Sequence, residues 1–294
     1  MMTFLNFFIS GISLGSIYAI IALGYTMVYG IAKMLNFAHG DVIMVGAYTC
    51  FYVVYRFQLP AVVGVLLAMC VCTTLGIVVE RLAYKPLRRA PSLAVLITAI
   101  GVSYFLQNMA LLLWSSNPKV FPSIVGAGTL KFFDDQLSVS YVTVLTIVTC
   151  LVIMAVLTWF VSNAKIGKAM RACSEDKNAA QLMGINVNGT ISITFAIGSG
   201  LAALAGVLLC SAYPTLMPTT GSLPGIKAFT AAVFGGIGSI PGAFLGGLLL
   251  GLIEIFAKAY ISTQLSDAVV FAVLIIVLLV KPAGLLGRNI QEKV

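Results

Sequence analysis

Long apolar runs dominate this sequence, and they constrain the fold more than any other feature. A transmembrane helix needs about 20 consecutive apolar residues, and the chain offers eight or nine stretches of about that kind. None of them alternates between polar and apolar positions, as barrel strands do. We therefore predict an all-α fold, a polytopic transmembrane helical bundle, with spans over roughly 4–32, 38–55, 60–80, 92–114, 140–161, 190–211, 225–238, 242–258 and 266–280.

Composition excludes the main alternatives. Charged residues make up 9% of the 294 residues and apolar residues 60%, whereas an average soluble protein carries roughly 25% charged residues. So few charges cannot cover a water-facing surface, which excludes a soluble globular protein. The formal net charge is +8, but the basic residues sit in short loops, and no basic patch is interleaved with aromatics. The expected surroundings are lipid, and no nucleic acid is expected as a partner.

The basic residues predict the orientation in the membrane. Twelve of the 17 lysines and arginines fall in loops on one side, namely 81–92, 162–189, the turn at Lys33 and the tail from Lys281. Cytoplasmic loops carry the excess of Lys and Arg. These loops are therefore predicted to be cytoplasmic, and segment 115–138 is predicted to face outward.

Two segments depart from the pattern of simple spans. Residues 225–238 make only about 21 Å of helix, too short for a hydrocarbon core of about 30 Å. The first run, 4–32, is too long and contains four glycines. Short or glycine-interrupted hydrophobic segments in the two halves of a transporter point to its translocation site. We therefore expect broken segments at both ends of the chain, with a hint of internal duplication.

Small residues recur at helix-packing spacing. Gly242 and Gly246, and Gly247 and Gly251, form two GxxxG pairs, and Gly198, Ala202 and Gly206 form a further row. Such rows allow close helix contact in membranes, and packing within the bundle is favoured over a subunit interface. The six cysteines lie mostly in apolar runs without CxxC spacing, so they are interpreted as packing residues.

The hydrophilic loop 162–189 is the most informative part of the chain. Ser174 is the predicted N-cap of a short helix over about 175–183, with Glu175 and Asp176 in its first turn and Gly184 as its stop. Ala179 and Ala180 are expected to form a close-packing face. A helix lying on lipid is a poor alternative, because only Leu182 and Met183 are large apolar groups. Docking into a protein groove is the better interpretation.

The Ala-Ala…Gly pattern of this loop resembles the cytoplasmic coupling loop of ABC importer permeases. Together with LNFAHGD (35–41), KAFTAAVFGGIGSIPGA (227–243) and LGSIYAIIALGYTMVYGI (14–31), it is similar to the Liv-type branched-chain amino-acid permeases over nearly the whole chain. The sequence departs in one detail, since family members often have Glu at the position of Asp41.

The resemblance implies a fold, a function and partners. It implies one permease domain over 1–294 with the coupling loop 162–189, a multi-pass protein of the bacterial cytoplasmic (inner) membrane. It implies ATP-driven import of branched-chain or related small amino acids by alternating access. The implied partners are a homologous second permease subunit, two ABC ATPase subunits and a periplasmic or extracellular substrate-binding protein.

The residues themselves point to no enzyme. The sequence contains no GxxxxGK[ST] phosphate loop, carboxylate pair or Ser/His/Asp set, and it has one histidine. We therefore expect no catalytic residue, no cofactor and no metal site, with ATP hydrolysed on partner subunits. Glu254 and Lys258 stand four residues apart near an outer helix end, where an i, i+4 pair or snorkelling is favoured over a proton relay.

Two alternative functions stay open. The first is an ABC permease for urea or short amides, and the second is a passive channel for a small polar solute. Secondary transport is disfavoured, because ion-coupled transporters usually carry ionisable groups within the membrane.

Several polar residues are candidates for the translocation path or gate. His39 and Asp41 are expected at a cytoplasmic turn, where they either stabilise the turn or contribute to an inner gate. Gln107 and Asn108 lie in the outward third of their span, where they either join helices or line a vestibule. The remaining candidates for the path are Tyr18, Asn36, Thr98 and Thr230.

Overall fold

The computed structural model describes residues 2–88, 90–122, 124–126, 128–132 and 137–287. The α-helices in these ranges are α1 Met2–Ala32, α2 His39–Tyr55, α3 Ala61–Val79, α4 Ser92–Trp114, α5 Tyr141–Asn163, α6 Lys165–Glu175, α7 Lys177–Leu182, α8 Val187–Ala212, α9 Ser222–Gly235, α10 Ile240–Tyr260 and α11 Ser266–Val280. A π-helical segment η1 (Glu80–Tyr84) and a 3-10 turn η2 (Lys85–Leu87) extend α3.

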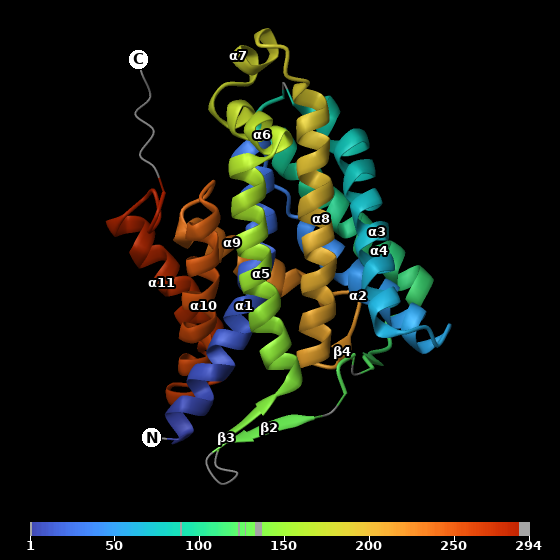
Figure 1. Cartoon of the computed structure of the whole chain (residues 1–294), viewed down its shortest axis with the longest axis vertical. Coiled ribbons are helices and arrows are strands. Elements are labelled where there is room, and N and C mark those ends of the chain that lie inside the picture. Colours follow the sequence, from blue (N-terminus) through green and yellow to red (C-terminus); the bar gives the residue numbers. More distant parts are fainter. Residues whose placement is uncertain (1, 89, 123, 127, 133–136, 288–294) are drawn as a thin grey trace.

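Two short antiparallel pairs lie outside the bundle. Strand β1 (Lys119–Val120) pairs with β4 (Thr215–Leu216), and β2 (Thr129–Phe132) pairs with β3 (Leu137–Ser140). They lie at the end of the molecule opposite to α6 and α7 (Figure 1). This matches the prediction that 115–138 and 162–189 occupy opposite sides.

The all-α membrane bundle is confirmed, but the predicted number of spans was too high. Among the described residues, six helices are long and apolar enough to cross a membrane. Helices α2, α9 and α11 have 17, 14 and 15 residues, which is shorter than the roughly 20 residues of a full span.

The prediction of a broken first segment was wrong, because α1 is one continuous helix of 31 residues. It contains no proline, and its glycines accommodate neighbouring helices. A Cβ on Gly15 would lie 2.8 Å from the Leu248 Cα, and one on Gly11 would lie 2.8 Å from the Leu252 Cδ2. The chain leaves the helix only after Ala32, at Lys33, whose φ is 57°.

Helices α1, α2 and α3 form one triplet, and helices α8, α9 and α10 form a second triplet that runs in the opposite direction (Figure 1). Helix α1 ascends toward the α7 end and α2 descends from the middle of the bundle, whereas α8 descends and α9 ascends from the middle (Figure 1). Helix α10 packs along α1, α3 packs along α8, and α1 contacts α8. The arrangement is that of an inverted repeat, in which α9 corresponds to α2 rather than to the first run of the chain.

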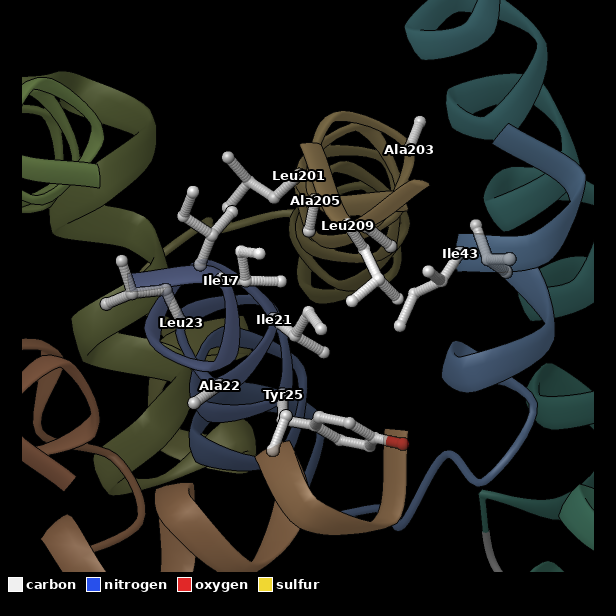
Figure 2. Close-up of a cluster of buried hydrophobic side chains, with 14 of the residues drawn as sticks. Ile17, Ile21, Ala22, Leu23, Tyr25, Ile43, Leu201, Ala203, Ala205 and Leu209 are labelled. Carbon is white, nitrogen blue, oxygen red and sulfur yellow. The ribbon is translucent and has the colours of Figure 1, made fainter. Parts of the chain in front are cut away.

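The core lies between α1, α2 and α8. Figure 2 shows Ile17 and Ile21 of α1 facing Leu201 and Leu209 of α8, with Ile43 of α2 beside them. Helices α4 and α5 instead expose most of their apolar residues. In lipid those faces need no protein cover, because lipid tails are as apolar as the side chains themselves.

The glycine rows pack within the bundle, as predicted. Gly246 meets the backbone of α9 at Ala231, Gly247 meets α1 at Ala19, and Gly206 meets α2 at Ile43. Five of the six cysteines are buried, and Cys70 is exposed on α3.

Candidate functional site

The first turns of α2 and α9 meet inside the bundle. A Cβ on Gly40 would lie 2.7 Å from the carbonyl oxygen of Gly221, and one on Gly225 would lie 2.8 Å from the Gly40 Cα. No side chain larger than hydrogen fits between these backbones. Two half-length helices therefore present their N-termini to the same place.

This meeting point lies deep in the bundle, not at a cytoplasmic turn as the sequence suggested for His39 and Asp41. The His39 ring lies 4.5 Å from the Tyr25 ring, centroid to centroid and tilted by 58°, and its Nε2 would lie 2.7 Å from a Cβ on Gly24. Gly24 is eight residues, or about 12 Å, before the end of α1. The connection 33–38 therefore descends into the bundle before α2 begins.

Gln107 joins three helices at this point. Its Nε2 donates to the Asp41 Oδ1 at 2.9 Å and lies 3.3 Å from the Ser222 Oγ, and Ser103 Oγ lies 3.2 Å away on its own helix. Gln107 of α4 is half-buried and hydrogen-bonds both half-helices, so it joins helices, which is one of the two interpretations predicted for it. Adjacent Asn108 is exposed, and among the described residues its side chain bonds the Tyr104 carbonyl of its own helix alone.

Two polar atoms here lack partners. Asp41 and His39 are each 1% exposed, and the Asp41 Oδ2 and His39 Nε2 have no hydrogen-bond partner among the described residues. The first turn of a helix favours a carboxylate, so α2 itself offsets part of the cost of burying Asp41. The meeting point is mildly polar. The Asp41 carboxylate is stabilised by the helix dipole of α2 and by the hydrogen bond from the Gln107 amide.

The other candidate path residues divide among different roles. Asn36 accepts a hydrogen bond of 2.8 Å from the Tyr84 hydroxyl and so ties the connection 33–38 to η1. Thr230 is buried in α9 and donates to the Ile226 carbonyl of its own helix. Thr98 is half-buried on α4. Among the hydrogen bonds of the described residues, none joins any of these three to the Asp41 carboxylate.

Sequence analysis missed a buried cluster of charges. The Glu254 Oε1 lies 2.8 Å from the Lys227 Nζ and 2.6 Å from the Lys258 Nζ, and Lys227 also pairs with Asp267 at 2.7 Å. Tyr18 donates its hydroxyl to the Glu254 Oε2 at 2.8 Å. The predicted pair of Glu254 and Lys258 is confirmed, but the bundle interior also carries Lys227, at 6% exposure, and Glu254, at 1%.

This charge cluster joins four helices, because its members come from α1, α9, α10 and α11. Its two cations and two anions balance. Lys227 stands near the start of the short apolar helix α9. A lysine in such a helix indicates that an acidic partner is buried beside it. The partner itself could not be found, because 27 residues separate Lys227 from Glu254 and 236 separate Tyr18 from Glu254.

Loop 162–189 contains a short helix, but its boundaries differ from the prediction. Ser174 and Glu175 belong to the end of α6, and the Ser174 hydroxyl bonds back to the Arg171 carbonyl. The N-cap of α7 is Asp176, whose Oδ1 accepts from the backbone N–H of Asn178 at 2.7 Å. Ser174 cannot cap α7 because it lies within α6, and Asp176 is an equally good N-cap residue at the break between the two helices.

The exposed face of α7 also differs from the prediction. Ala180 is 4% exposed and packs against its own chain, whereas Ala179 is exposed. Leu182 and Met183 are 89% and 83% exposed at the tip. Gly184 stops the helix with a φ of +82°, as predicted. The tip therefore presents large apolar side chains, and the small residue faces inward.

Lys177 connects α7 to the core of the bundle. Its Nζ donates to the Ala32 carbonyl at 2.6 Å, at the C-terminus of α1, where a cation is favoured. Burial and the nearby positive charges of Arg88 and Lys33 lower the pKa of Lys177. A displacement of α7 would thus reach α1 directly.

The sequence matches a family model described as branched-chain amino acid transport system / permease component over residues 7–278. It is 45% identical to the high-affinity branched-chain amino acid transport system permease protein LivH of Escherichia coli K12, over 99% of this chain and 98% of that protein. The permease protein BraD of Pseudomonas aeruginosa has the same identity and coverage. A probable LivH of Methanocaldococcus jannaschii is 27% identical over 91% of this chain and 88% of its own length.

A solved structure shares the fold. PsaBC from Streptococcus pneumoniae, in complex with Fab, superposes with a TM-score of 0.50 and 14% identity, covering 95% of this chain and 92% of that chain. At this identity the likeness concerns the architecture alone.

Proposed function

Because the chain belongs to the family of branched-chain amino acid transport permeases, we propose that it is the membrane-spanning subunit of an ATP-driven ABC importer for branched-chain or related small amino acids. The observation that carries this proposal is the 45% identity over 99% of the chain and 98% of the relative.

The importer acts in the bacterial cytoplasmic membrane together with separate subunits. Two ABC ATPases supply the energy, a homologous permease subunit completes the membrane pathway, and an external binding protein delivers the amino acid. Helix α7 docks on an ATPase, and its exposed Leu182 and Met183 are the apolar contacts. The contact from Lys177 to the Ala32 carbonyl carries the movement of α7 into α1.

The translocation path passes the meeting point of α2 and α9. Half-helices with apposed N-termini near the middle of the bundle are the geometry in which transporters place their substrate sites. The Gly40–Gly221 contact closes the path in this conformation. Rocking of the two inverted triplets separates the half-helices, and the bond from Gln107 to Asp41 adjusts as they move.

Uptake by the reconstituted complex tests this function. The chain is co-expressed with its partner subunits and reconstituted into proteoliposomes with ATP inside. We expect binding-protein-dependent accumulation of labelled leucine, isoleucine or valine. Accumulation of urea or short amides in their place would establish the related permease function, and equal flux without ATP would establish a passive channel.

A further inference from the structure

A cavity of about 580 Å³ lies between the α7-proximal end of α3 and the first turns of α8. Its volume falls within the range of roughly 300–1,000 Å³ typical of ligand pockets. One wall is formed by Ile77, Arg81 and Lys85, which are spaced four residues apart along α3, η1 and η2. Asn188 and Ser192 lie on the opposite wall. A π-helical segment such as η1 is itself frequent at functional sites.

The mouth of this cavity is positively charged. Glu80, the nearest acid, is fully buried, pairs with Arg88 and accepts a hydrogen bond of 2.6 Å from the Ser192 hydroxyl. Arg81 and Lys85 are exposed, and neither forms an ion pair or hydrogen bond with another side chain in the part of the chain that the structure describes. The Asn188 Oδ1 accepts a hydrogen bond from Arg88, so the two cations and the Asn188 Nδ2 are the groups available to an anion.

The floor of the cavity is apolar and opens toward lipid. Ile77 lies one helical turn deeper than Arg81, and Ile193 and Ala196 lie correspondingly deeper on α8. Ile193 is 37% exposed, and the neighbouring Val78 is 43% exposed. Polar groups at the membrane surface with apolar groups below them match the shape of a phospholipid. A small soluble anion would contact only the polar groups at the mouth and would leave the apolar floor uncovered.

We propose that this groove binds the headgroup of an anionic phospholipid of the cytoplasmic leaflet. Its phosphate sits between Arg81 and Lys85, and the first part of an acyl chain lies along Ile77 and Ile193. Basic pockets on the cytoplasmic side of membrane helices suit such headgroups. The site adjoins a second cavity of about 200 Å³, lined in part by Arg88 and Lys177. A bound lipid therefore supports the junction between α7 and the bundle.

Lipid binding to the purified transporter tests the site directly. The whole complex is delipidated in detergent, and phosphatidylglycerol or phosphatidylcholine is added before native mass spectrometry. We expect retention of phosphatidylglycerol and not of phosphatidylcholine. Each basic residue near an anionic surface contributes about fivefold in affinity, so Arg81→Gln/Lys85→Gln should bind phosphatidylglycerol roughly 25-fold more weakly.

A matched control separates a defined site from general surface charge. Lys165→Gln/Lys168→Gln removes the same charge from exposed positions on α6 and should leave binding unchanged. Equal loss in this control, or undiminished binding in the Arg81/Lys85 variant, overturns the proposal. So does inorganic phosphate that competes as well as phosphatidylglycerol, or release of the ATPase subunits by the Arg81/Lys85 variant in lipid-free detergent. If the double variant does not fold, Lys85→Gln alone must show the fivefold loss.

Discussion

Gly40 and Gly221 are in backbone contact, and the carbonyl oxygen of Gly221 occupies the space that a Cβ on Gly40 would need, at 2.7 Å. These residues belong to opposite halves of the chain and stand at the starts of α2 and α9. Gly221 has an ordinary φ of −85°, so close approach, not backbone conformation, requires glycine there.

Substitution at this contact should separate the half-helices. Gly221→Ala inserts a methyl group against the Gly40 backbone, and overpacking of this kind typically costs about 1–3 kcal/mol. We expect a lowered melting temperature in detergent and a loss of amino-acid uptake. Gly101→Ala on α4 is the control, because a Cβ there meets nothing within 4 Å. Equal effects of the two substitutions would contradict the contact.

Removal of one partner from the buried charge cluster should destabilise the chain strongly. Glu254→Gln removes the buried carboxylate shared by Lys227 and Lys258, and leaves Lys227, which is 6% exposed, paired only with the half-exposed Asp267 in the described part of the chain. Breaking a buried pair costs about 3–5 kcal/mol. Lys258→Gln should cost less, because its side chain is 36% exposed and such pairs contribute about 0–1 kcal/mol. Thermal unfolding of the purified chain compares the two, and a larger effect at Lys258 would disprove this ranking.

Two adjacent amides on α4 should differ in importance. Gln107→Leu removes the amide that bonds both Asp41 and Ser222 and leaves Ser103 as the remaining side-chain partner of Asp41, and a hydrogen bond to a charged group contributes about 1.5–3 kcal/mol. We expect uptake to fall sharply. Asn108→Leu removes only a bond within α4 and should transport nearly as the parent does. If both variants transport normally, the hydrogen bond between Gln107 and Asp41 is not required for transport.

The tip and the inner face of α7 should respond differently to charge. Leu182→Asp changes a side chain that is 89% exposed, so stability should change by no more than about 0.5 kcal/mol, while the ATPases detach or lose coupling. Ala180→Arg should instead disrupt the packing of α7 on its own chain. Protease sensitivity of loop 162–189, measured beside ATPase co-purification, distinguishes the two. Normal uptake by Leu182→Asp would remove the tip from the docking surface.

Labelling of introduced cysteines should establish the orientation. In a Cys70→Ser background the remaining native cysteines are buried. Asn178→Cys on α7 and Ser138→Cys on β3 both introduce an exposed thiol. A membrane-impermeant maleimide applied to intact cells should label position 138 and not position 178. Labelling of position 178 from outside would reverse the predicted topology.

Local signals in the sequence predicted the helices well. Apolar length located α4 and α5 to within about two residues, and Gly184 ends α7 where a left-handed stop was expected. The glycines of the first run were misread as breaks. A glycine costs a helix only about 1 kcal/mol, whereas an unpaired backbone group in lipid costs several. The helix therefore continues through them, and the break comes in the connection 33–38, after Lys33.

Composition and apolar length were enough to predict a helical membrane protein, because burial in lipid and backbone hydrogen bonding depend on local composition. The permease type followed from the resemblance of four sequence motifs to a known family. The tertiary structure alone decided which polar groups meet. The apposition of Gly40 with Gly221, the pairing of Lys227 with Glu254 and the inward face of Ala180 all join residues through the crossing of separate helices. The residue pattern along one helix does not identify the helix that packs against it. Contacts between residues far apart in the sequence therefore become known only from the folded bundle.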